Sequence, residues 1–561
     1  MARDHIIITD DGARDVPDED STWWEWVSAS KGRNFVLGQQ LLDWLDMYGR
    51  RKGFVRDDRD PDYDERFDFL EVLFRKGDEF EAAVLRWLEE RFDIVRVSTG
   101  WQDTQDRAAA ERTFEVMAEG REIIAQAVLW NPQTRTYGAP DLLVRSDVLN
   151  RIVPGTLSSE ETGLTAPGLD GASWHYVIVD VKFSTLELSS DGHVAGKPEY
   201  MTQLWIYNEA LGRLQGFTPP SAYLLGRATK QDDVRSSSAL DRLGRVDRDH
   251  VFKDGVALAE LAAEACAWIR RVRSDGREWE VLPEPSVPEL MPKRFGESGK
   301  WGDAMSQILQ ALAPRDRKPV TTPLVLPLHV SANEELWRTP APAEFYVDFE
   351  TTLDLNDTFE AFPEKGSTPL IYMVGCGWLE DPLDASTWQF RSFTTDRLTE
   401  VEEARTLDAW IDFMREACEA RGTTLEEARL FHWHWAETSF LDTQYNSPIK
   451  RHGRGDWAGL PWVDLLHRVF KAEPILVGGT AGYGLKEIAR ALHEEGIIET
   501  LWGDGVADGM EAMAAAWWAD GEAKKAGRSM REFDVMDAIE TYNEIDCRVM
   551  AEILAWLRRE R

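Results

Sequence analysis

An aspartate and a lysine stand out because both lie where a buried strand is expected. Asp180 and Lys182 fall within the run YVIVDVKFS, and they share one face of the predicted strand because strand side chains alternate. A buried charge is costly unless it is paired or binds a cation. Two interpretations are therefore open: an Asp–Lys pair at a sheet edge, or one side of a metal centre.

Further polar side chains flank this strand at spacings that suit a common site. Asp141 follows a Gly-Ala-Pro turn and begins a predicted strand, while Glu81 borders the apolar stripe of a predicted helix. Downstream, Gln203 and Tyr207 lie one helical turn apart on one face. Carboxylate oxygens are preferred ligands of Mg²⁺ and Mn²⁺, and a lysine beside them can offset charge in a transition state. The residues therefore favour metal-assisted hydrolysis.

The order of these motifs resembles the RecB-like branch of the PD-(D/E)xK nucleases, over roughly residues 77–227. The resemblance implies these roles: Glu81, Asp141 and Asp180 as metal ligands that act in catalysis, Lys182 as the catalytic lysine, and Gln203 and Tyr207 as nucleic-acid-binding residues. Many relatives have a histidine at the first motif, where this chain has Phe80 and Glu81. We call Glu81, Asp141, Asp180 and Lys182 the first centre.

A second group of carboxylates is predicted in the other half of the chain. In the run EFYVDFETT, Asp348 and Glu350 share one face of a strand, and a divalent cation between them would relieve their repulsion. Tyr542 and Asp546 lie one turn apart on a predicted helix near the end of the chain. Between these segments, Glu437 follows a predicted strand and opens a helix.

This second pattern resembles the DEDD 3′–5′ exonucleases of RNase H-like fold over roughly 344–561, in the branch often fused to RecB-like nucleases. The resemblance implies a two-metal site with the carboxylates Asp348, Glu350, Glu437 and Asp546, and with Tyr542 as the catalytic residue that orients water. The family more often has Asp where Glu437 stands, and Asp442 and Asp464 are the alternatives. We call the four carboxylates the second centre.

Other polar residues in this half have ordinary explanations. Lys486 is expected to be a helix-start lysine, although relatives carry a Ser-Leu-Lys run at this place. His432 and His434 could suggest zinc, but without nearby cysteines they are expected to be plain strand positions. The 24 tryptophans are expected mainly in the core, with base stacking as the alternative for some of them.

Composition limits the class of protein. The 561 residues include 43% hydrophobic and 29% charged residues, which is a soluble globular composition without a run that could span a membrane. The four cysteines form no CxxC pair, which argues against a zinc or iron–sulfur site and fits a cytoplasmic location. The net charge of −36 is unusual for a nucleic-acid-binding protein, but bound divalent cations can supply positive charge locally.

The elements that must position these residues are of the mixed α/β kind. In the first half we expect helices near 77–92 and 199–213 and strands near 94–98, 122–130, 137–145, 175–183 and 221–227. In the second half we expect strands near 344–350, 369–377, 387–393 and 429–433, a helix at 399–420, and mostly helices after that. The predicted fold class is a PD-(D/E)xK restriction-endonuclease-like domain followed by an RNase H-like domain. The predicted bounds are 1–282 for the RecB-like domain with its helical N-terminal region, 283–343 for a proline-rich connector, and 344–561 for the DEDD domain.

The sequence thus predicts a nuclease that depends on Mg²⁺ or Mn²⁺ and hydrolyses DNA with single-stranded regions or ends, in DNA repair or antiviral defence. The second site is expected to be a 3′–5′ exonuclease on DNA or RNA. The chain has no P-loop, so any unwinding needs a separate helicase as partner. The alternative is a nucleic-acid-binding scaffold in which one site, first of all the C-terminal one, is catalytically silent.

Overall fold

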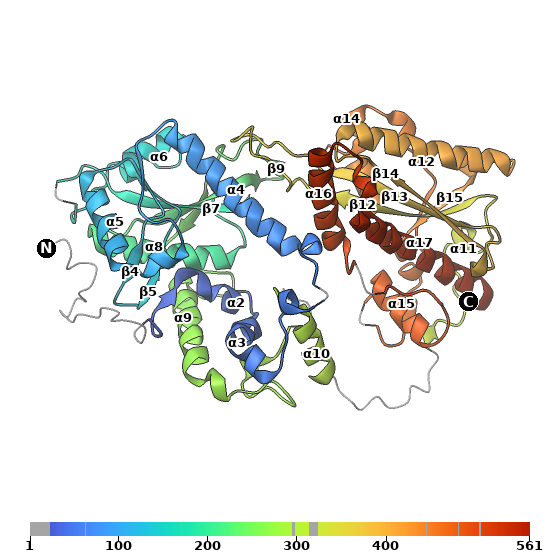
Figure 1. Cartoon of the computed structure of the whole chain (residues 1–561), viewed down its shortest axis with the longest axis horizontal. Helices are drawn as coiled ribbons and strands as arrows, with labels where there is room; N and C mark the ends of the chain where they lie inside the picture. Colours follow the sequence, from blue (N-terminus) through green and yellow to red (C-terminus); the bar gives the residue numbers. More distant parts are fainter. Residues whose placement is uncertain are drawn as a thin grey trace. The chain divides into compact units, whose positions relative to one another are not determined.

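The computed structural model describes residues 23–61, 63–169, 171–293, 298–312, 324–444, 446–480, 482–503 and 506–561 (Figure 1). Two stretches of the predicted connector, 294–297 and 313–323, lie outside the described residues. The described residues divide into two compact units, the first within Met1–Tyr63, Leu73–Pro314 and Asp357–Gly366, the second within Asp64–Val72, Arg315–Asn356 and Ser367–Arg561. Among the described helices, none is long and apolar enough to cross a membrane.

The first unit is built from strands and helices of very different length. Its strands are β1 Val27–Ser28, β2 Ile94–Arg96, β3 Ile123–Ala125, β4 Leu129–Asn131, β5 Thr136–Gly138, β6 Leu142–Arg145, β7 Tyr176–Leu188, β8 Ser221–Gln231, β9 Val234–Arg235 and β10 Gly244–Asp247. Its helices are α2 Arg33–Val36, α3 Gln40–Tyr48, α4 Phe69–Glu89, α5 Arg107–Glu119, α6 Ser146–Ile152, α7 Ser159–Thr162, α8 Pro198–Gln215, α9 Leu258–Asp275 and α10 Gly302–Leu312. The first residues of α4, up to Val72, are grouped with the second unit.

The main sheet of the first unit has the strand order β10-β8-β7-β6-β3-β2, and β9 pairs with β8. Strand β7 runs antiparallel to β6 and parallel to β8. Strand β3 runs antiparallel to β6 and parallel to β2. A second, three-stranded sheet has the order β1-β5-β4. The main sheet is therefore mixed, and the long strands β7 and β8 lie next to each other inside it.

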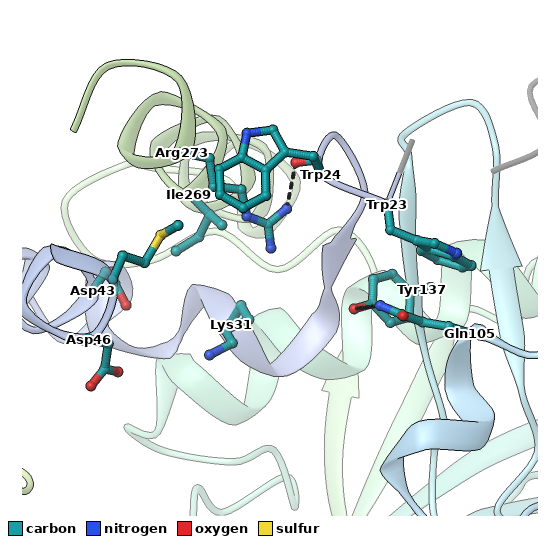
Figure 2. A pocket seen from close by; sticks show the side chains of 10 residues that line it. Trp23, Trp24, Lys31, Asp43, Asp46, Gln105, Tyr137, Ile269 and Arg273 are labelled. Carbon is teal, nitrogen blue, oxygen red and sulfur yellow. Dashed lines mark hydrogen bonds between the residues drawn. The ribbon is translucent and has the colours of Figure 1, made fainter. Parts of the chain in front are cut away.

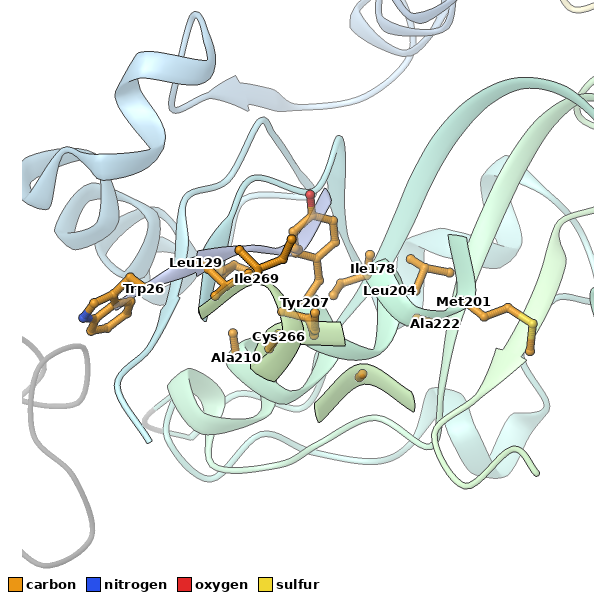
Figure 3. Packing of buried hydrophobic residues seen from close by; sticks show 14 of the residues in the cluster. Trp26, Leu129, Ile178, Met201, Leu204, Tyr207, Ala210, Ala222, Cys266 and Ile269 are labelled. Carbon is orange, nitrogen blue, oxygen red and sulfur yellow. The ribbon is translucent and has the colours of Figure 1, made fainter. Parts of the chain in front are cut away.

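Strand β7 separates two hydrophobic cores because both of its faces are buried. Tyr176 and Ile178 pack in the core that holds α8 and α9, part of which Figure 3 shows. Val177 and Val179 pack on the opposite face in the core that holds α4. Burying one such aliphatic side chain contributes about 1.5–3 kcal/mol, so this alternation fixes the register of the strand. Asp180 continues the alternation of Tyr176 and Ile178, so its side chain lies on the face of β7 that packs against α8.

Two of the predicted strands are each divided into two in the structure. The strand predicted at 122–130 is β3 and β4, because Gln126 adopts a positive φ of 52° between them. The strand predicted at 137–145 is β5 and β6, separated by the Ala139-Pro140 turn. A continuous strand was the wrong prediction in both places, because each break sends the chain from one sheet to the other.

A segment from the C-terminal half of the sequence completes a core of the first unit. Phe359, in the segment Asp357–Gly366, lies with its ring centroid 5.6 Å from that of Phe80 and 5.7 Å from that of Phe183. The Nζ atom of Lys76 donates a hydrogen bond to the carbonyl oxygen of Asp357 at 2.9 Å. The hydrophobic core next to the first centre therefore includes residues that follow strand β12 in sequence.

The second unit contains a five-stranded sheet and α17, the longest of the described helices. Its strands are β11 Val325–Leu326, β12 Glu344–Thr352, β13 Leu370–Leu379, β14 Trp388–Thr394, β15 Arg429–His432, β16 Trp462–Asp464 and β17 Leu476–Val477. Its helices are α11 Glu334–Trp337, α12 Glu400–Ala420, α13 Ala436–Thr438, α14 Pro448–His452, α15 Leu485–Glu494, α16 Gly509–Ala526 and α17 Asp534–Glu560, with π-helical turns at Ser439–Thr443 and Leu466–Phe470.

The five-stranded sheet has the order β14-β13-β12-β15-β16. Strand β12 is antiparallel to β13 and parallel to β15. Its residues Phe345 and Val347 pack in the core that holds α12, and Tyr346 packs in the core that holds α17. Because side chains alternate, Asp348 and Glu350 follow Tyr346 and lie on the α17 side of the sheet.

Candidate metal centres

Asp141 and Asp180 lie side by side. Asp141 directly precedes β6, and Asp180 lies within β7. The Oδ2 atom of Asp141 accepts a hydrogen bond from the backbone N–H of Val181 at 2.6 Å, and the N–H of Asp141 donates to Asp180 Oδ1 at 3.4 Å. Asp180 is only 1% exposed. The antiparallel pairing of Leu142 with Val179 places the turn before β6 against β7. The two predicted ligands therefore meet as the sequence suggests.

Glu81 reaches the same place from helix α4 through a contact with a glutamine. The amide Nε2 of Gln126 donates to Glu81 Oε1 at 2.6 Å and to Asp141 Oδ1 at 3.2 Å. The amide thus connects a carboxylate on a helix with one at the start of a strand. The carboxylate oxygens of Glu81, Asp141 and Asp180 do not all approach within 4.8 Å of one another in the part of the chain that is described.

Lys182 and Tyr207 complete this region from the β7 and α8 sides. The Nζ atom of Lys182 forms an ion pair with Asp180 Oδ2 at 2.5 Å, without the direction of a regular hydrogen bond. Tyr207 accepts a hydrogen bond from Gln203 Nε2 at 2.9 Å. Gly138 is required here, because a Cβ atom at that position would lie 2.6 Å from the Tyr207 ring.

The pKa values of the first centre are shifted because several acidic groups lie close together and are shielded from solvent. Burial and then the charge of Asp180 raise the pKa of Asp141 well above its ordinary value. Burial also raises the pKa of Glu81, although the hydrogen bond from Gln126 opposes the shift. Burial would lower the pKa of Lys182, but the charges of Asp180 and Asp141 outweigh it and raise the pKa. Lys182 therefore carries a positive charge next to an excess of negative charge, a setting that suits a bound cation.

The second centre is more compact than the first. One carboxylate oxygen each of Asp348, Glu350 and Asp546 lies within 4.8 Å of the others. Asp348 and Glu350 come from β12, and Asp546 comes from α17, which packs on the same face of the sheet. The oxygen-only set fits a hard divalent cation such as Mg²⁺ or Mn²⁺. These are three of the four carboxylates that the sequence pattern placed together, and the fourth, Glu437, is not in the group.

Asn543, which the sequence analysis did not single out, contacts two of these acids. Its Nδ2 atom donates to Asp348 Oδ2 at 2.7 Å and lies 3.4 Å from Glu350 Oε1. Asn543 is fully buried, and its Oδ1 atom has no hydrogen-bond partner among the described residues. A Cβ atom at Gly375 would lie only 1.8 Å from that oxygen, so β13 needs glycine at this position. An unpartnered buried oxygen next to carboxylates is a further oxygen ligand suited to a cation.

Tyr542 and Lys486 form the solvent side of the second centre. Burial raises the pKa of Asp546, and the phenol of Tyr542, which hydrogen-bonds to that carboxyl, opposes the rise. The Nζ atom of Lys486 lies 4.5 Å from the ring centroid of Tyr542 and donates a hydrogen bond to the carbonyl of Ala507. The charge of Lys486 also opposes the rise in the pKa of Glu350. Lys486 is the second residue of α15, as the sequence predicted, and it also lies beside the carboxylates of the second centre.

Glu437 lies outside the compact group, but its charge raises the pKa of Asp348, Glu350 and Asp546. Its Oε2 atom interacts with His432 Nδ1 at 3.0 Å. His432 lies on β15, as the sequence predicted, and there it fixes the side chain of Glu437.

The remaining polar residues of this region pair with one another. Asp464 interacts through Oδ2 with His467 Nδ1 at 2.8 Å, and the ring of His434 lies 5.1 Å from that of His467. Asp442 lies in the π-helical turn after α13. The carboxylates of Asp442 and Asp464, like that of Glu437, are not part of the compact group, but the charge of Glu437 acts on the pKa of all three of its members.

Burial governs the charge state of the second centre in the absence of a cation. Burial raises the pKa of Glu350 to about 8, with a further contribution from the charge of Asp546. Burial raises the pKa of Asp546 to about 7, although Lys486 opposes the shift. Burial, together with the Asp546 and Glu350 charges, raises the pKa of Asp348 well above its ordinary value. A cation would have to displace these protons.

A hollow of about 320 Å³ lies in the first unit (Figure 2). Trp23, Trp24 and Tyr137 form its aromatic walls, and Arg273 donates a hydrogen bond to the carbonyl of Trp24 at 2.8 Å. Asp43 also lines the hollow and accepts hydrogen bonds from Asn34 Nδ2 and Trp268 Nε1. None of the predicted ligands lines this hollow, so the hollow is not where the predicted chemistry would occur.

Three residues near the two centres were not predicted: Gln126, Asn543 and Lys486. Asn543 could have been found, because it lies three residues before Asp546 and adjoins the same face of α17. The Ser-Leu-Lys run of relatives was the signal for Lys486. No local pattern marks Gln126, because its contacts come from α4 and from the turn before β6.

Comparison with known proteins supports the C-terminal assignment. Residues 345–558 match the family model of the RNase H superfamily. No curated protein and no solved structure matches the chain. The RecB-like domain predicted for the first half stays a prediction. The matched range contains β15 and nearly all of β12 and α17, so the C-terminal part of the chain holds an RNase H-like domain, and this domain carries the compact carboxylate group of the second centre.

Proposed function

We propose that the protein is a divalent-metal-dependent nuclease that hydrolyses phosphodiester bonds. The observation that carries this proposal is the convergence of Asp348, Glu350 and Asp546 within 4.8 Å in an RNase H-like domain. A bound Mg²⁺ or Mn²⁺ would activate a water and neutralise charge on the scissile phosphate. The proposed ligands are these three carboxylates and Glu437.

Two side chains, Tyr542 and Lys486, would position the attacking water and the phosphate at the second centre. The phenol of Tyr542, next to Asp546, is in position to hold the attacking water by a hydrogen bond. Lys486 lies above the ring of Tyr542 and adds one positive charge where the phosphate must enter. A fixed cation near the phosphate stabilises the charge that develops in the transition state. We propose that this centre is a 3′–5′ exonuclease that acts on DNA or RNA, because the order of its motifs resembles the DEDD exonucleases.

We propose the first centre as a second nuclease site of PD-(D/E)xK type. Asp141 and Asp180 are held together by backbone contacts, and Lys182 lies 2.5 Å from Asp180. An ion pair of this kind keeps the lysine charged and aimed at the carboxylates. In this proposal the lysine orients the nucleophile, and Glu81 is the third ligand. DNA with single-stranded regions or ends is the proposed substrate, in repair or antiviral defence with a separate helicase.

The alternative proposal is a nucleic-acid-binding scaffold with a silent second centre. The net charge of −36 and the glutamate at position 437, where the family more often has aspartate, favour this alternative. It differs from the nuclease proposal in one measurable property, because a scaffold would bind nucleic acid without turnover at the second centre.

The test uses the purified full chain with labelled single-stranded and double-stranded DNA and RNA, in Mg²⁺, in Mn²⁺ and in EDTA. Metal-dependent cleavage that EDTA abolishes would support the nuclease. Undiminished cleavage in EDTA would contradict both centres. Binding of the labelled substrates without cleavage under all metal conditions would favour the scaffold.

A further inference from the structure

Gln126 has a backbone conformation that is unusual for a residue with a side chain. Its φ of 52° lies in the left-handed region, which costs free energy for residues other than glycine. Two hydrogen bonds hold it there: its N–H donates to the carbonyl of Asp141 at 2.9 Å, and its carbonyl accepts from Ser98 Oγ at 2.9 Å. The backbone of Gln126 is therefore fixed relative to the turn that carries Asp141.

The side chain of Gln126 uses both hydrogens of its amide on carboxylates. Nε2 donates to Glu81 Oε1 at 2.6 Å and to Asp141 Oδ1 at 3.2 Å. Within the described part of the chain, this amide is the one hydrogen-bond donor to the Glu81 carboxylate. Glu81 lies on a long side chain at the border of helix α4, where it is only partly buried. Without the amide, repulsion from Asp141 and Asp180 would favour rotation of Glu81 toward solvent.

We propose that Gln126 is a positioning residue of the first centre, whose amide holds Glu81 and Asp141 ready for one divalent cation. This inference rests on the proposed function of that centre. Outer partners that orient metal ligands typically account for 10-fold to 100-fold in metal affinity. Gln126 combines two features of such a partner, because its backbone is fixed and its donor contacts two ligands from different elements.

The test measures metal binding directly, in the full chain with the second centre disabled by Asp348→Asn and Glu350→Gln. In this background, Gln126→Met keeps most of the side-chain volume but removes the hydrogen-bond donor. Gln126→Ala removes both the donor and most of the side-chain volume. We expect both variants to weaken Mn²⁺ binding, followed by electron paramagnetic resonance, by about tenfold or more. Cleavage at saturating Mn²⁺ should stay within a few fold of the background, because the ligands themselves remain.

The matched control is Gln231→Met in the same background. Gln231 is a glutamine of the same unit whose amide donates to the carbonyls of Ser189 and Ser190, and its loss should leave Mn²⁺ affinity unchanged. A melting temperature measured without metal separates positioning from folding. If Gln126→Met lowers that temperature but binds Mn²⁺ like the background, Gln126 is a structural brace and the inference is wrong. If the background binds no Mn²⁺, the first centre itself is wrong and the inference falls with it.

Discussion

Lys486 lies over the ring of Tyr542, with Nζ 4.5 Å from the ring centroid. The two residues come from the start of α15 and the middle of α17, and they meet beside Asp546. A lysine in this place brings a positive charge to a site that otherwise consists of carboxylates. A group of carboxylates alone would favour only a cation. A lysine beside them also favours a polyanionic substrate.

The first prediction concerns this lysine. Lys486→Ala should lower turnover at the second centre by on the order of 10²-fold, because it removes a fixed positive charge near the reacting phosphate. Mn²⁺ binding should persist, since all four carboxylates remain. Single-turnover cleavage of a labelled strand at saturating Mn²⁺ measures the effect, with Lys471→Ala as the control lysine, whose Nζ lies over the ring of Tyr483. Unchanged turnover in Lys486→Ala would mean that the lysine only caps the carbonyl of Ala507.

A second prediction concerns pH. The pKa values of Glu350 and Asp546, about 8 and about 7, lie above their ordinary values of 4.5 and 3.8. Their contribution to the stability of the metal-free protein is therefore complete below the ordinary values and is lost as pH rises through about 7 and 8. Mn²⁺ must displace these protons, so it should raise the melting temperature more at about pH 8.5 than at about pH 6.

The control for this pH effect is the double variant Asp348→Asn with Glu350→Gln, which removes two of the ligands. In this variant the difference between the two pH values should become smaller, and what is left of it reports the first centre, where the pKa values of Asp141 and Glu81 are also raised. A Mn²⁺-induced rise in melting temperature that is equal at both pH values in the unmodified chain would contradict the prediction.

Some parts of the two centres followed from sequence because they depend on short-range geometry. The alternation of β7 placed Asp180 with Lys182, and the helical period placed Tyr542 with Asp546. Such relations need only a correct element and its period. The acid on α4 was also predicted, because Glu81 borders a clear apolar stripe.

Other parts could not be predicted because they depend on breaks and distant pairings. The positive φ of Gln126 ends β3 where the hydrophobic pattern continues, and nothing local in the sequence marks that change. The packing of Phe359 beside Phe80 joins residues that are almost three hundred positions apart in the chain. A single sequence contains no signal for such a pairing, since both residues are simply apolar.

A third prediction follows from that pairing. Phe359→Ala should destabilise the first unit by about 3 kcal/mol, because it leaves a cavity between Phe80 and Phe183. Hydrogen exchange should therefore increase in α4 and β7. Leu383→Ala, at a position 45% exposed in the same half of the sequence, is the control and should have little effect. Increased exchange confined to β12 and β13 would contradict this account of the segment Asp357–Gly366.

A fourth prediction concerns Lys182. Lys182→Met should remove most turnover at the first centre, because the positive charge beside Asp180 is lost while the carboxylates remain. The variant should also be less stable without metal, since it leaves Asp180 buried without its partner, and Mn²⁺ should restore part of that stability. Cleavage and melting temperature in both conditions measure the two effects. Cleavage at the unmodified rate would make the lysine only a partner of Asp180.

The last prediction is that the two centres fail independently. All proposed ligands of the first centre lie in the first unit, and all those of the second lie in the second unit, so neither takes a ligand from the other. Asp180→Asn should therefore abolish one activity and spare the other, and Asp348→Asn should do the reverse. Loss of a ligand from a metal site costs orders of magnitude in rate, far more than a distant packing change.

The measurement is cleavage of each substrate class by both variants and by their combination, with a melting curve to verify folding. If Asp180→Asn alone removes every activity from a folded protein, the second centre is silent and the RNase H-like domain binds nucleic acid without cleaving it. If Asp348→Asn alone does so, the first centre is not a nuclease site.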